Sequence, residues 1–251
     1  MTSALWAIAQ PRMHWTLDGN VGEVLAALEE AAAAGAEGCV CTELAVTGFH
    51  RRVPELLDAV ALADAQQRIR AACALLGIAA VVGMPTLGAA GEVFNSHIAI
   101  AADGRELCRT HKRGLTPSEA TFFTTGQERC WTGLGSVLAV SVLCREMLDG
   151  DELLPLLHAA LPTGDVRPRV IFWPSYISEA DAELGQAYRD GASAMARALG
   201  AWVLNSNWAE SLNEPCARGF GGGVVIAPDG RLVRTLPVDA AALMVVALGA
   251  G

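Results

Sequence analysis

The sequence predicts an α/β protein in which two mixed sheets pack face to face with helices on the outside. Short apolar runs of strand length alternate along the chain with longer Ala- and Leu-rich segments of helical period. Hairpins interrupt this alternation, which favours mixed sheets over purely parallel ones. With 251 residues, of which 52% are hydrophobic and 18% charged, the chain can bury such strands on both faces.

In the first half of the chain, apolar runs indicate strands, and segments rich in Ala, Leu and Glu indicate helices. The helix after the first strand is expected to end near Gly35. Extended runs on both sides of Ala102, Asp103 and Gly104 predict a hairpin. The elements expected here are strand 4–10, helix 20–37, strand 38–44, helix 56–77, strand 78–85 and hairpin 93–112.

The second half continues the same alternation and ends in a hairpin around Asp229 and Gly230. Pro155 is expected in the first turn of its helix, where a missing N–H costs least. The expected elements are strand 135–144, helix 151–162, strand 168–174, helix 178–200, strand 201–207, hairpin 221–237 and strand 242–248. No Ser/Pro/Gly-rich linker and no fixed-period repeat divides the chain, so we expect one domain over residues 1–251.

Composition and charge exclude several classes of function. The formal net charge is −9 and no run of Lys or Arg exceeds two residues, which argues against a nucleic-acid or anionic membrane surface. Seven scattered cysteines without a CxxC pair argue against a disulfide framework or a zinc site and favour reduced thiols. The N-terminus lacks a signal-peptide pattern, and apolar stretches break before the ~18 residues of a membrane span. We therefore expect a cytoplasmic protein that acts on a small molecule.

Three predicted strands end on residues that could carry chemistry together. Glu43 ends the run CVCTEL, Lys112 ends ELCRTHK, and Cys144 ends VLAVSVLC. In α/β sheets reactive groups collect where strands pass into loops. A carboxylate can take the proton of a thiol, and an ammonium can stabilise both the thiolate and a developing oxyanion. The sequence therefore indicates a cysteine nucleophile site.

The surroundings of these residues resemble the nitrilase, or carbon–nitrogen hydrolase, superfamily, whose members use a Glu–Lys–Cys triad in this chain order. Thr47-Gly48-Phe49 follows Glu43 as a TGY-like turn, and the loop of Lys112 carries Glu119 and the closing Gly126. Segments that resemble the rest of the family pattern are AIAQ at 7–10, FNSHIAI at 94–100, FWPSYIS at 172–178, VLNSN at 203–207 and GGGVVIAPDG at 221–230. The resemblance therefore covers nearly the whole chain.

The resemblance implies a four-layer α-β-β-α sandwich and hydrolysis of a non-peptide carbon–nitrogen bond in a small amide, carbamoyl compound or nitrile. Glu43 would be the general base for Cys144, and a thioester acyl-enzyme would form as ammonia or an amine leaves. Lys112 and the backbone N–H of Arg145 would hold the oxyanion, while Glu119 would orient Lys112 or the leaving group. The resemblance implies no metal or organic cofactor. It does imply a homodimer or larger homo-oligomer.

Several positions depart from the family pattern. Thr42 replaces a proline before the triad glutamate, Arg145 replaces an aromatic residue after the nucleophile, and Gly223 stands where a serine is usual. The Arg145 side chain is expected either to bind a substrate carboxylate or to pair with Glu146 or another nearby acid. These departures leave the triad intact, but they limit any transfer of substrate specificity.

Other interpretations of these residues remain open from sequence alone. Cys144 could be a buried structural thiol, Lys112 a solvated charge and Glu119 an acid in the first turn of a short helix. The aromatic residues Trp173, Tyr176 and Trp208 are candidates either for the substrate wall or for the core. The competing functions are amide formation by acyl transfer to an amine, a non-catalytic binding or regulatory protein that retained the fold, and thiol redox chemistry. The lack of a resolving cysteine near Cys144 disfavours the last of these.

Overall fold

Two mixed sheets form the centre of the protein, in a computed structural model that describes residues 4–178 and 182–249. Within those residues each sheet has six strands. The first sheet, in spatial order, consists of β12 (Ala242–Leu248), β1 (Ala4–Gln10), β2 (Gly38–Val40), β3 (Ala79–Leu87), β4 (Val93–Ile100) and β5 (Glu106–His111). The second consists of β11 (Leu232–Thr235), β10 (Val224–Ile226), β9 (Ala201–Asn207), β8 (Arg169–Ser175), β7 (Val137–Ser141) and β6 (Thr132–Leu134).

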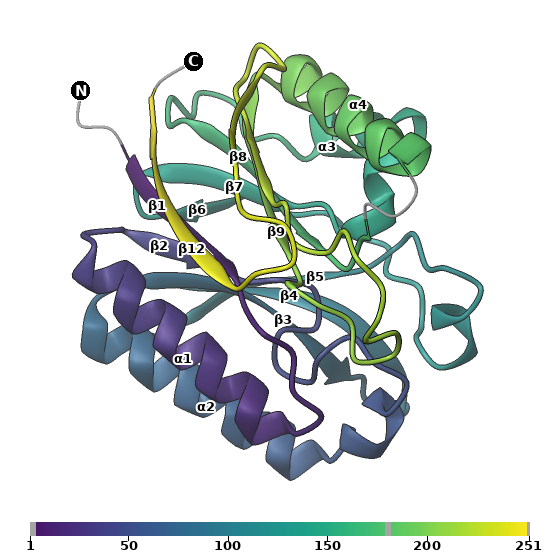
Figure 1. Ribbon diagram of the computed structural model, residues 1–251. Coiled ribbons are helices and arrows are strands. Elements are labelled where there is room, and N and C mark those ends of the chain that lie inside the picture. Colours follow the sequence, from purple (N-terminus) through teal and green to yellow (C-terminus); the bar gives the residue numbers. More distant parts are fainter. Residues whose placement is uncertain (1–3, 179–181, 250–251) are drawn as a thin grey trace.

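The two sheets share one plan. The strands β1, β2 and β3 are parallel in the first sheet, as β7, β8 and β9 are in the second, and antiparallel strands flank both groups. Two helices cover the outer face of each sheet (Figure 1), which makes the layers α-β-β-α as expected. These helices are α1 (Leu17–Ala33) and α2 (Ala59–Leu76) on the first sheet, and α3 (Gly150–Ala159) and α4 (Ala182–Leu199) on the second. None of the helices in the described ranges is long and apolar enough to cross a membrane.

Side-chain caps determine where the first two helices begin. The Thr16 hydroxyl accepts from the N–H of Gly19 at 3.2 Å, and the Asp58 carboxylate accepts from that of Ala61 at 2.7 Å. Gly77 ends α2 with a φ of +65°, a conformation that glycine adopts without steric cost. Both helices pack their apolar residues against the first sheet.

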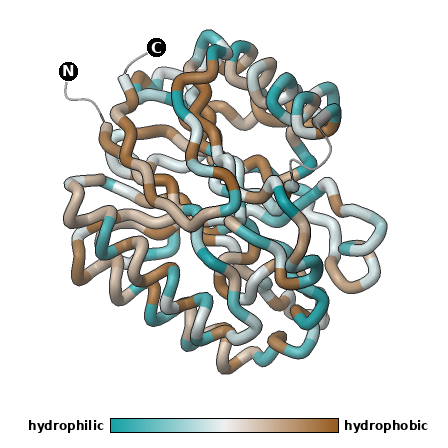
Figure 2. Tube along the Cα trace, in the orientation of Figure 1, coloured by the Kyte–Doolittle hydropathy of each residue, from teal (hydrophilic) through white to brown (hydrophobic). Residues whose placement is uncertain are grey.

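Apolar side chains form three layers between these elements. One layer lies between the first sheet and α1 and α2, and another between the second sheet and α3 and α4. The third lies between the sheets, where the rings of Trp6 and Phe172 approach to 4.7 Å between centroids. Figure 2 shows the hydrophobic residues concentrated in the strands, with hydrophilic residues on the outer helices. Both sheets are therefore buried on two faces, which explains their continuous apolar runs.

The fold corrects several boundaries. Strand 38–44 is β2 alone, because the chain turns at Leu44 with a φ of +52°. The predicted strand 135–144 is β7 and stops before Cys144, and the short edge strand β6 was missed because three residues carry little periodicity. α1 begins at Leu17, before residue 20, because Thr16 caps it. Residues 179–181 of the predicted helix 178–200 lie outside the described residues.

The expectation for Pro155 is wrong. α3 begins at Gly150, so Pro155 lies inside the helix, beyond its first turn. A proline there removes an intrahelical hydrogen bond from a helix of ten residues. The helix keeps its place because Leu153 and Leu157 are buried against the second sheet, and this packing outweighs the lost bond.

Candidate active site

Glu43 lies just beyond the carboxyl end of β2, and its side chain is fully buried. The indole N–H of Trp208 donates to the Glu43 carbonyl at 2.8 Å, which fixes the backbone from the opposite sheet. Gly83 on β3 packs against this backbone so closely that a Cβ there would collide with the Thr42 carbonyl. The strand end is thus held on two sides, and the carboxylate points into the protein.

Lys112 follows β5 directly and is 1% exposed. Its backbone N–H donates to the Asn95 carbonyl at 2.7 Å, and its carbonyl accepts from the N–H of Gly126 at 2.8 Å. A Cβ on Gly126 would collide with the His111 carbonyl, so this position requires glycine. The glycine closes the loop 113–125 back onto the lysine and fixes the start of its side chain.

A buried network joins Lys112 to two carboxylates. The Lys112 ammonium donates to Glu43 Oε1 at 2.6 Å and to Glu119 Oε1 at 2.7 Å. The Asn95 side-chain amide donates to the same two oxygens at 2.9 Å and 3.3 Å. Glu119 begins the short 3-10 helix η2 (Glu119–Thr121), and its other oxygen accepts from the N–H of Thr116 at 2.9 Å. The ammonium therefore lies at a fixed point between two acids.

Cys144 opens the 3-10 helix η3 (Cys144–Leu148) with a φ of +48°, a conformation that non-glycine residues rarely adopt. The indole N–H of Trp173 donates to its carbonyl at 3.0 Å and holds this turn. The Cys144 thiol lies 3.9 Å from the Tyr176 carbonyl. Arg145 is the second residue of the helix, where N–H groups have no intrahelical partner. The turn therefore presents a thiol next to an available backbone donor.

Burial and charge keep the thiol protonated at rest. Burial and the Glu43 carboxylate raise the pKa of Cys144 despite the opposing effect of Lys112. Burial raises the pKa of Glu43, which Lys112 partly offsets. Burial alone would lower the pKa of Lys112, but Glu43, Cys144 and Glu119 outweigh it and raise that pKa. The resting site thus holds a neutral thiol and an ammonium beside carboxylate groups.

Glu43 keeps one oxygen available for a proton. Within the described residues its Oε2 is buried and makes no hydrogen bond of good geometry, whereas Oε1 accepts from Lys112 and Asn95. The Cys144 thiol is near enough to lower the pKa of Glu43 slightly by hydrogen bonding. An unpaired buried carboxylate oxygen is costly, and the Cys144 thiol is a hydrogen-bond donor to this carboxyl group.

Glu146 connects the lysine loop to the cysteine turn. Its Oε1 accepts from the backbone N–H groups of Arg113 at 2.5 Å and Gly114 at 3.1 Å, and from the Arg129 guanidinium at 2.6 Å. Its Oε2 accepts from the N–H of Leu143 at 2.8 Å. The carboxylate is fully buried and thus ties the residues after Lys112 to the residue before Cys144.

Replacing Glu146 with glutamine is expected to destabilise the protein by about 3 kcal/mol or more, because Arg129 is left as a buried unpaired charge. At this chain length such a loss lowers the melting temperature by roughly 6–12 °C. Glu152→Gln is the matched control, since Glu152 pairs with Arg113 at 3.7 Å but is 72% exposed. Thermal unfolding followed by circular dichroism measures both. Equal melting temperatures for the two variants would contradict the connecting role of Glu146.

The remaining predicted residues have varied surroundings. Trp173 is 3% exposed and donates to the Cys144 carbonyl, so it supports the turn that carries this thiol. Tyr176 stacks on Phe49 with ring centroids 4.6 Å apart, and its hydroxyl hydrogen-bonds Ser211 at 2.5 Å. The Arg145 side chain pairs with Asp149 at 3.3 Å, so the neighbouring acid it was expected to meet is Asp149.

Sequence reasoning gave no site role to Asn95 or Arg129, which contact the site residues or their supports. Trp208, a candidate for the substrate wall or the core, instead binds the backbone of Glu43. One available signal also went unused. Lys112 is the only lysine in the chain, and the rest of the 18 Lys and Arg residues are arginines. A residue type that occurs once, and is then buried between two carboxylates, is unlike ordinary solvated charge. In the described ranges no group of three or more His, Cys, Asp or Glu residues could hold a metal ion.

Comparison with protein families supports a specific assignment of this fold. A family model described as carbon–nitrogen hydrolase matches residues 5–152, more than half of the chain. The matched range includes Glu43, Lys112, Glu119 and Cys144. A search of curated proteins found no match.

Similar solved structures include several forms of an amidase from Nesterenkonia sp. AN1. A glutamate-to-glutamine mutant with acrylamide added at its active-site cysteine is 19% identical with a TM-score of 0.84, covering 98% of this chain and 94% of that one. A cysteine-to-alanine mutant in complex with butyramide is 19% identical with a TM-score of 0.83, covering 98% and 91%. A cysteine-to-serine mutant is 19% identical with a TM-score of 0.84, covering 99% and 93%. At such identities the likeness shows that the fold is shared.

Proposed function

The chain belongs to the carbon–nitrogen hydrolase family, and from this premise we propose that it is an amidase that hydrolyses small amides through a thioester on Cys144. The observation that carries the proposal is the buried meeting of Lys112 with Glu43 and Glu119 beside the strained turn of Cys144. Structural ion pairs seldom combine a lone lysine, two acids and a thiol at the ends of strands from different sheets.

Attack by Cys144 requires removal of its proton in the same step. Because the pKa of the thiol is raised, a thiolate is not preformed, and a base must take the proton as the sulfur approaches the amide carbon. Glu43 supplies that base through Oε2, the oxygen without another partner among the described residues. Burial raises the pKa of Glu43 and strengthens it as a proton acceptor.

The negative charge that develops on the amide oxygen needs donors already in place. The Lys112 ammonium, fixed by two carboxylates, and the backbone N–H of Arg145, at the start of η3, fulfil this role. The ammonium cannot give up its proton easily, because its acidic neighbours raise its pKa. It therefore acts as a fixed charge, and Glu43 performs the proton transfer.

Collapse of the tetrahedral intermediate breaks the carbon–nitrogen bond. The proton that Glu43 took from the thiol passes to the nitrogen, ammonia leaves, and the acyl group remains on Cys144 as a thioester. Glu43 then takes a proton from water, the hydroxide attacks the thioester, and the carboxylic acid leaves as the thiol recovers its proton. Glu119 keeps Lys112 in position throughout, and these steps use only residues of this chain.

Aromatic side chains favour a small acyl group. Phe49, Tyr176 and Phe220 pack in a row, with ring centroids 4.6 Å and 5.2 Å apart. The Lys112 ammonium lies 5.8 Å from the Phe49 ring, and the Tyr176 carbonyl lies beside the Cys144 thiol. We take this row as one wall of the acyl site, which favours a small acyl group. The amidase of similar fold was solved with acrylamide and butyramide, compounds of this size.

Ammonia release tests the proposal. The purified protein is incubated with acetamide, propionamide, butyramide, N-carbamoyl amino acids and the matching nitriles, and ammonia is assayed over time. We expect release from the short amides and none from Cys144→Ala. Added hydroxylamine should intercept the thioester and yield a hydroxamate at the expense of the acid.

The alternatives give different results in this assay. Acid formation from nitriles but not amides would replace amidase with nitrilase, and release only from carbamoyl compounds would indicate a carbamoylase. Amide formation with added amines but no hydrolysis would indicate an acyltransferase. A protein that binds amides without turnover would be non-catalytic. Assembly into a homodimer or larger homo-oligomer stays a prediction, which light scattering on the purified protein can test, and so does a cytoplasmic location.

A further inference from the structure

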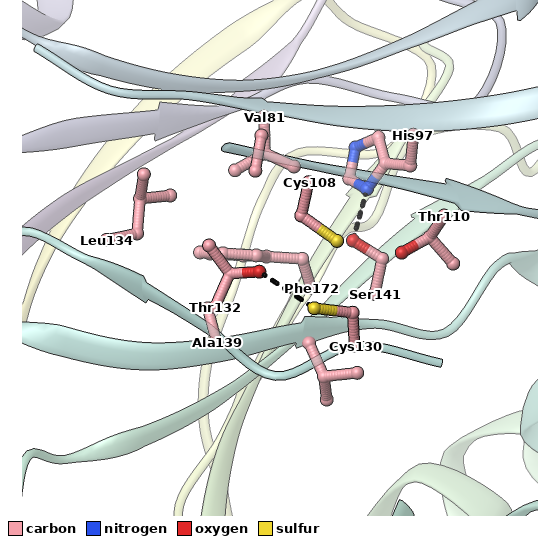
Figure 3. A pocket seen from close by; sticks show the side chains of 12 residues that line it. Val81, His97, Cys108, Thr110, Cys130, Thr132, Leu134, Ala139, Ser141 and Phe172 are labelled. Atoms are coloured by element: carbon pink, nitrogen blue, oxygen red, sulfur yellow. Dashed lines mark hydrogen bonds between the residues drawn. The ribbon is translucent and has the colours of Figure 1, made fainter. Parts of the chain in front are cut away.

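Two cysteines meet where the open edges of the two sheets face each other, away from Cys144. Cys108 lies on β5, the edge strand of the first sheet, and Cys130 lies two residues before β6, the edge strand of the second. Both line a narrow cavity between the sheets, together with Val81, Leu134 and Phe172. Figure 3 shows both sulfur atoms in this space, that of Cys108 from β5 and that of Cys130 from the loop before β6.

The two thiols interact directly. Cys130 raises the pKa of Cys108 through a side-chain hydrogen bond and its charge, in addition to the larger effect of burial. The Cys130 sulfur also lies 3.5 Å from the Thr132 hydroxyl, which holds it at the mouth of the cavity. Cys130 is exposed and Cys108 is half-buried, so solvent reaches the Cys130 thiol more readily. The remaining cysteine described as exposed, Cys216, lies on a different loop.

We propose that Cys108 and Cys130 are a reversible oxidation site, at which a disulfide fastens the open edges of the two sheets to each other. The oxidant is a low-molecular-weight disulfide such as oxidised glutathione. The pair is separate from the proposed nucleophile, so the proposal does not depend on amidase activity. It also differs from a structural disulfide framework, because both thiols are free in the reduced protein.

The exchange occurs in two steps that balance. The Cys130 thiol, which solvent reaches, loses its proton and attacks one sulfur of oxidised glutathione, so that a mixed disulfide forms and one glutathione leaves as a thiol. The Cys108 thiol then loses its proton, attacks the Cys130 sulfur and releases the second glutathione. The protein pair loses two electrons and two protons, and the glutathione disulfide gains them. Burial of Cys108 favours this order, because a thiol with a raised pKa reacts poorly with an outside oxidant.

The bond would close a segment that matters for the site. Residues 109–129 lie between the two cysteines and include Lys112 and Glu119. They also include Arg129, the residue directly before Cys130, whose guanidinium binds the buried Glu146. A link at the two ends of this segment restricts its freedom in the unfolded chain more than in the folded one. Oxidation should therefore raise the melting temperature, by roughly 5–10 °C for a closed loop of this length.

The experiment uses the full chain with Cys144→Ala, because a tryptic peptide of the natural sequence, 130–145, would contain both Cys130 and Cys144. The reduced protein is incubated with oxidised glutathione, blocked with N-ethylmaleimide, unfolded and digested with trypsin without reductant. Mass spectrometry should find peptide 106–109 joined to peptide 130–145, lighter by two hydrogen atoms than the separate thiols. Thermal unfolding of the same samples should show the expected rise, reversed by dithiothreitol.

Matched variants separate this pair from other thiols. Adding Cys216→Ser, which removes another exposed cysteine, should leave the linked peptide and the rise in melting temperature unchanged. Adding Cys108→Ser or Cys130→Ser should remove both. The proposal is overturned if glutathione stays on Cys130 as a mixed disulfide, if Cys130 joins only a second copy of the chain, or if the linked protein melts no higher than the reduced one.

Discussion

Replacing Cys144 with alanine is expected to lower kcat by about 10⁴-fold or more, to the background of the assay. Alanine cannot form the thioester, and the Cys144 thiol is the one that interacts with both Glu43 and Lys112. Cys144→Ser should be nearly as inactive, because Glu43 is matched to a thiol and a serine hydroxyl is much harder to deprotonate. Ammonia release from the best amide measures both variants.

Loss of the fold would give the same result, so stability is measured alongside activity. Cys144 is 6% exposed and its turn is held by Trp173 through the backbone, which the substitutions leave in place. We therefore expect near-normal circular dichroism spectra. Cys130→Ser is the control for thiol loss away from the site and should keep full activity in reducing buffer. Comparable turnover in Cys144→Ala would exclude covalent catalysis by this residue.

Lys112→Gln is expected to reduce kcat by about two to three orders of magnitude and to change KM far less. The ammonium is needed most when charge develops on the amide oxygen, so its loss affects the transition state more than the bound substrate. Lys112→Arg should not restore activity. The ammonium nitrogen lies 2.6 Å from a Glu43 oxygen and 2.7 Å from a Glu119 oxygen, and the larger, planar guanidinium does not fit in that space. Steady-state kinetics on the amide identified above measures these effects.

The same substitutions also affect stability. Removing the ammonium leaves two buried carboxylates near each other, so unfolding by urea should show a loss of free energy in Lys112→Gln. The control is Arg113→Gln at the neighbouring position. The Arg113 side chain is partly exposed, and its ion pair with Glu152 is long, at 3.7 Å. Near-normal kcat in a folded Lys112→Gln protein would remove Lys112 from the proposed mechanism.

Sequence periodicity predicted most of the elements but not where the strands stop. β2 and β7 are shorter than expected, and the chain turns at Leu44 and Cys144, which adopt positive φ. An apolar run in the sequence does not predict such a turn. The conformation is held from elsewhere, by the indole N–H groups of Trp208, which follows β9 of the opposite sheet, and of Trp173 on the neighbouring strand β8. Local propensity carries no information about contacts between residues so far apart in the chain.

The sequence predicted the candidate reactive residues but not the residues that hold them in place. Glu43, Lys112 and Cys144 stand out because each is a reactive side chain at the end of a predicted strand. Asn95 and Arg129 do not, since an amide within a strand and an arginine in a loop are ordinary in sequence. Their importance arises only when Asn95 meets two carboxylates and Arg129 meets Glu146 inside the protein. Such roles depend on three-dimensional contacts and could not be assigned beforehand.

The solitary, fully buried Lys112 gives the protein an internal reporter of its own opening. A protease that cleaves only after lysine has one target in the chain, and in the folded state the two sheets hide that target. Cleavage into fragments 1–112 and 113–251 would thus report the opening that exposes the bond, without any label or substitution. When cutting is slower than reclosing, the rate of this single cut measures the population in which the segment around the ammonium is open, independently of whether any amide is turned over.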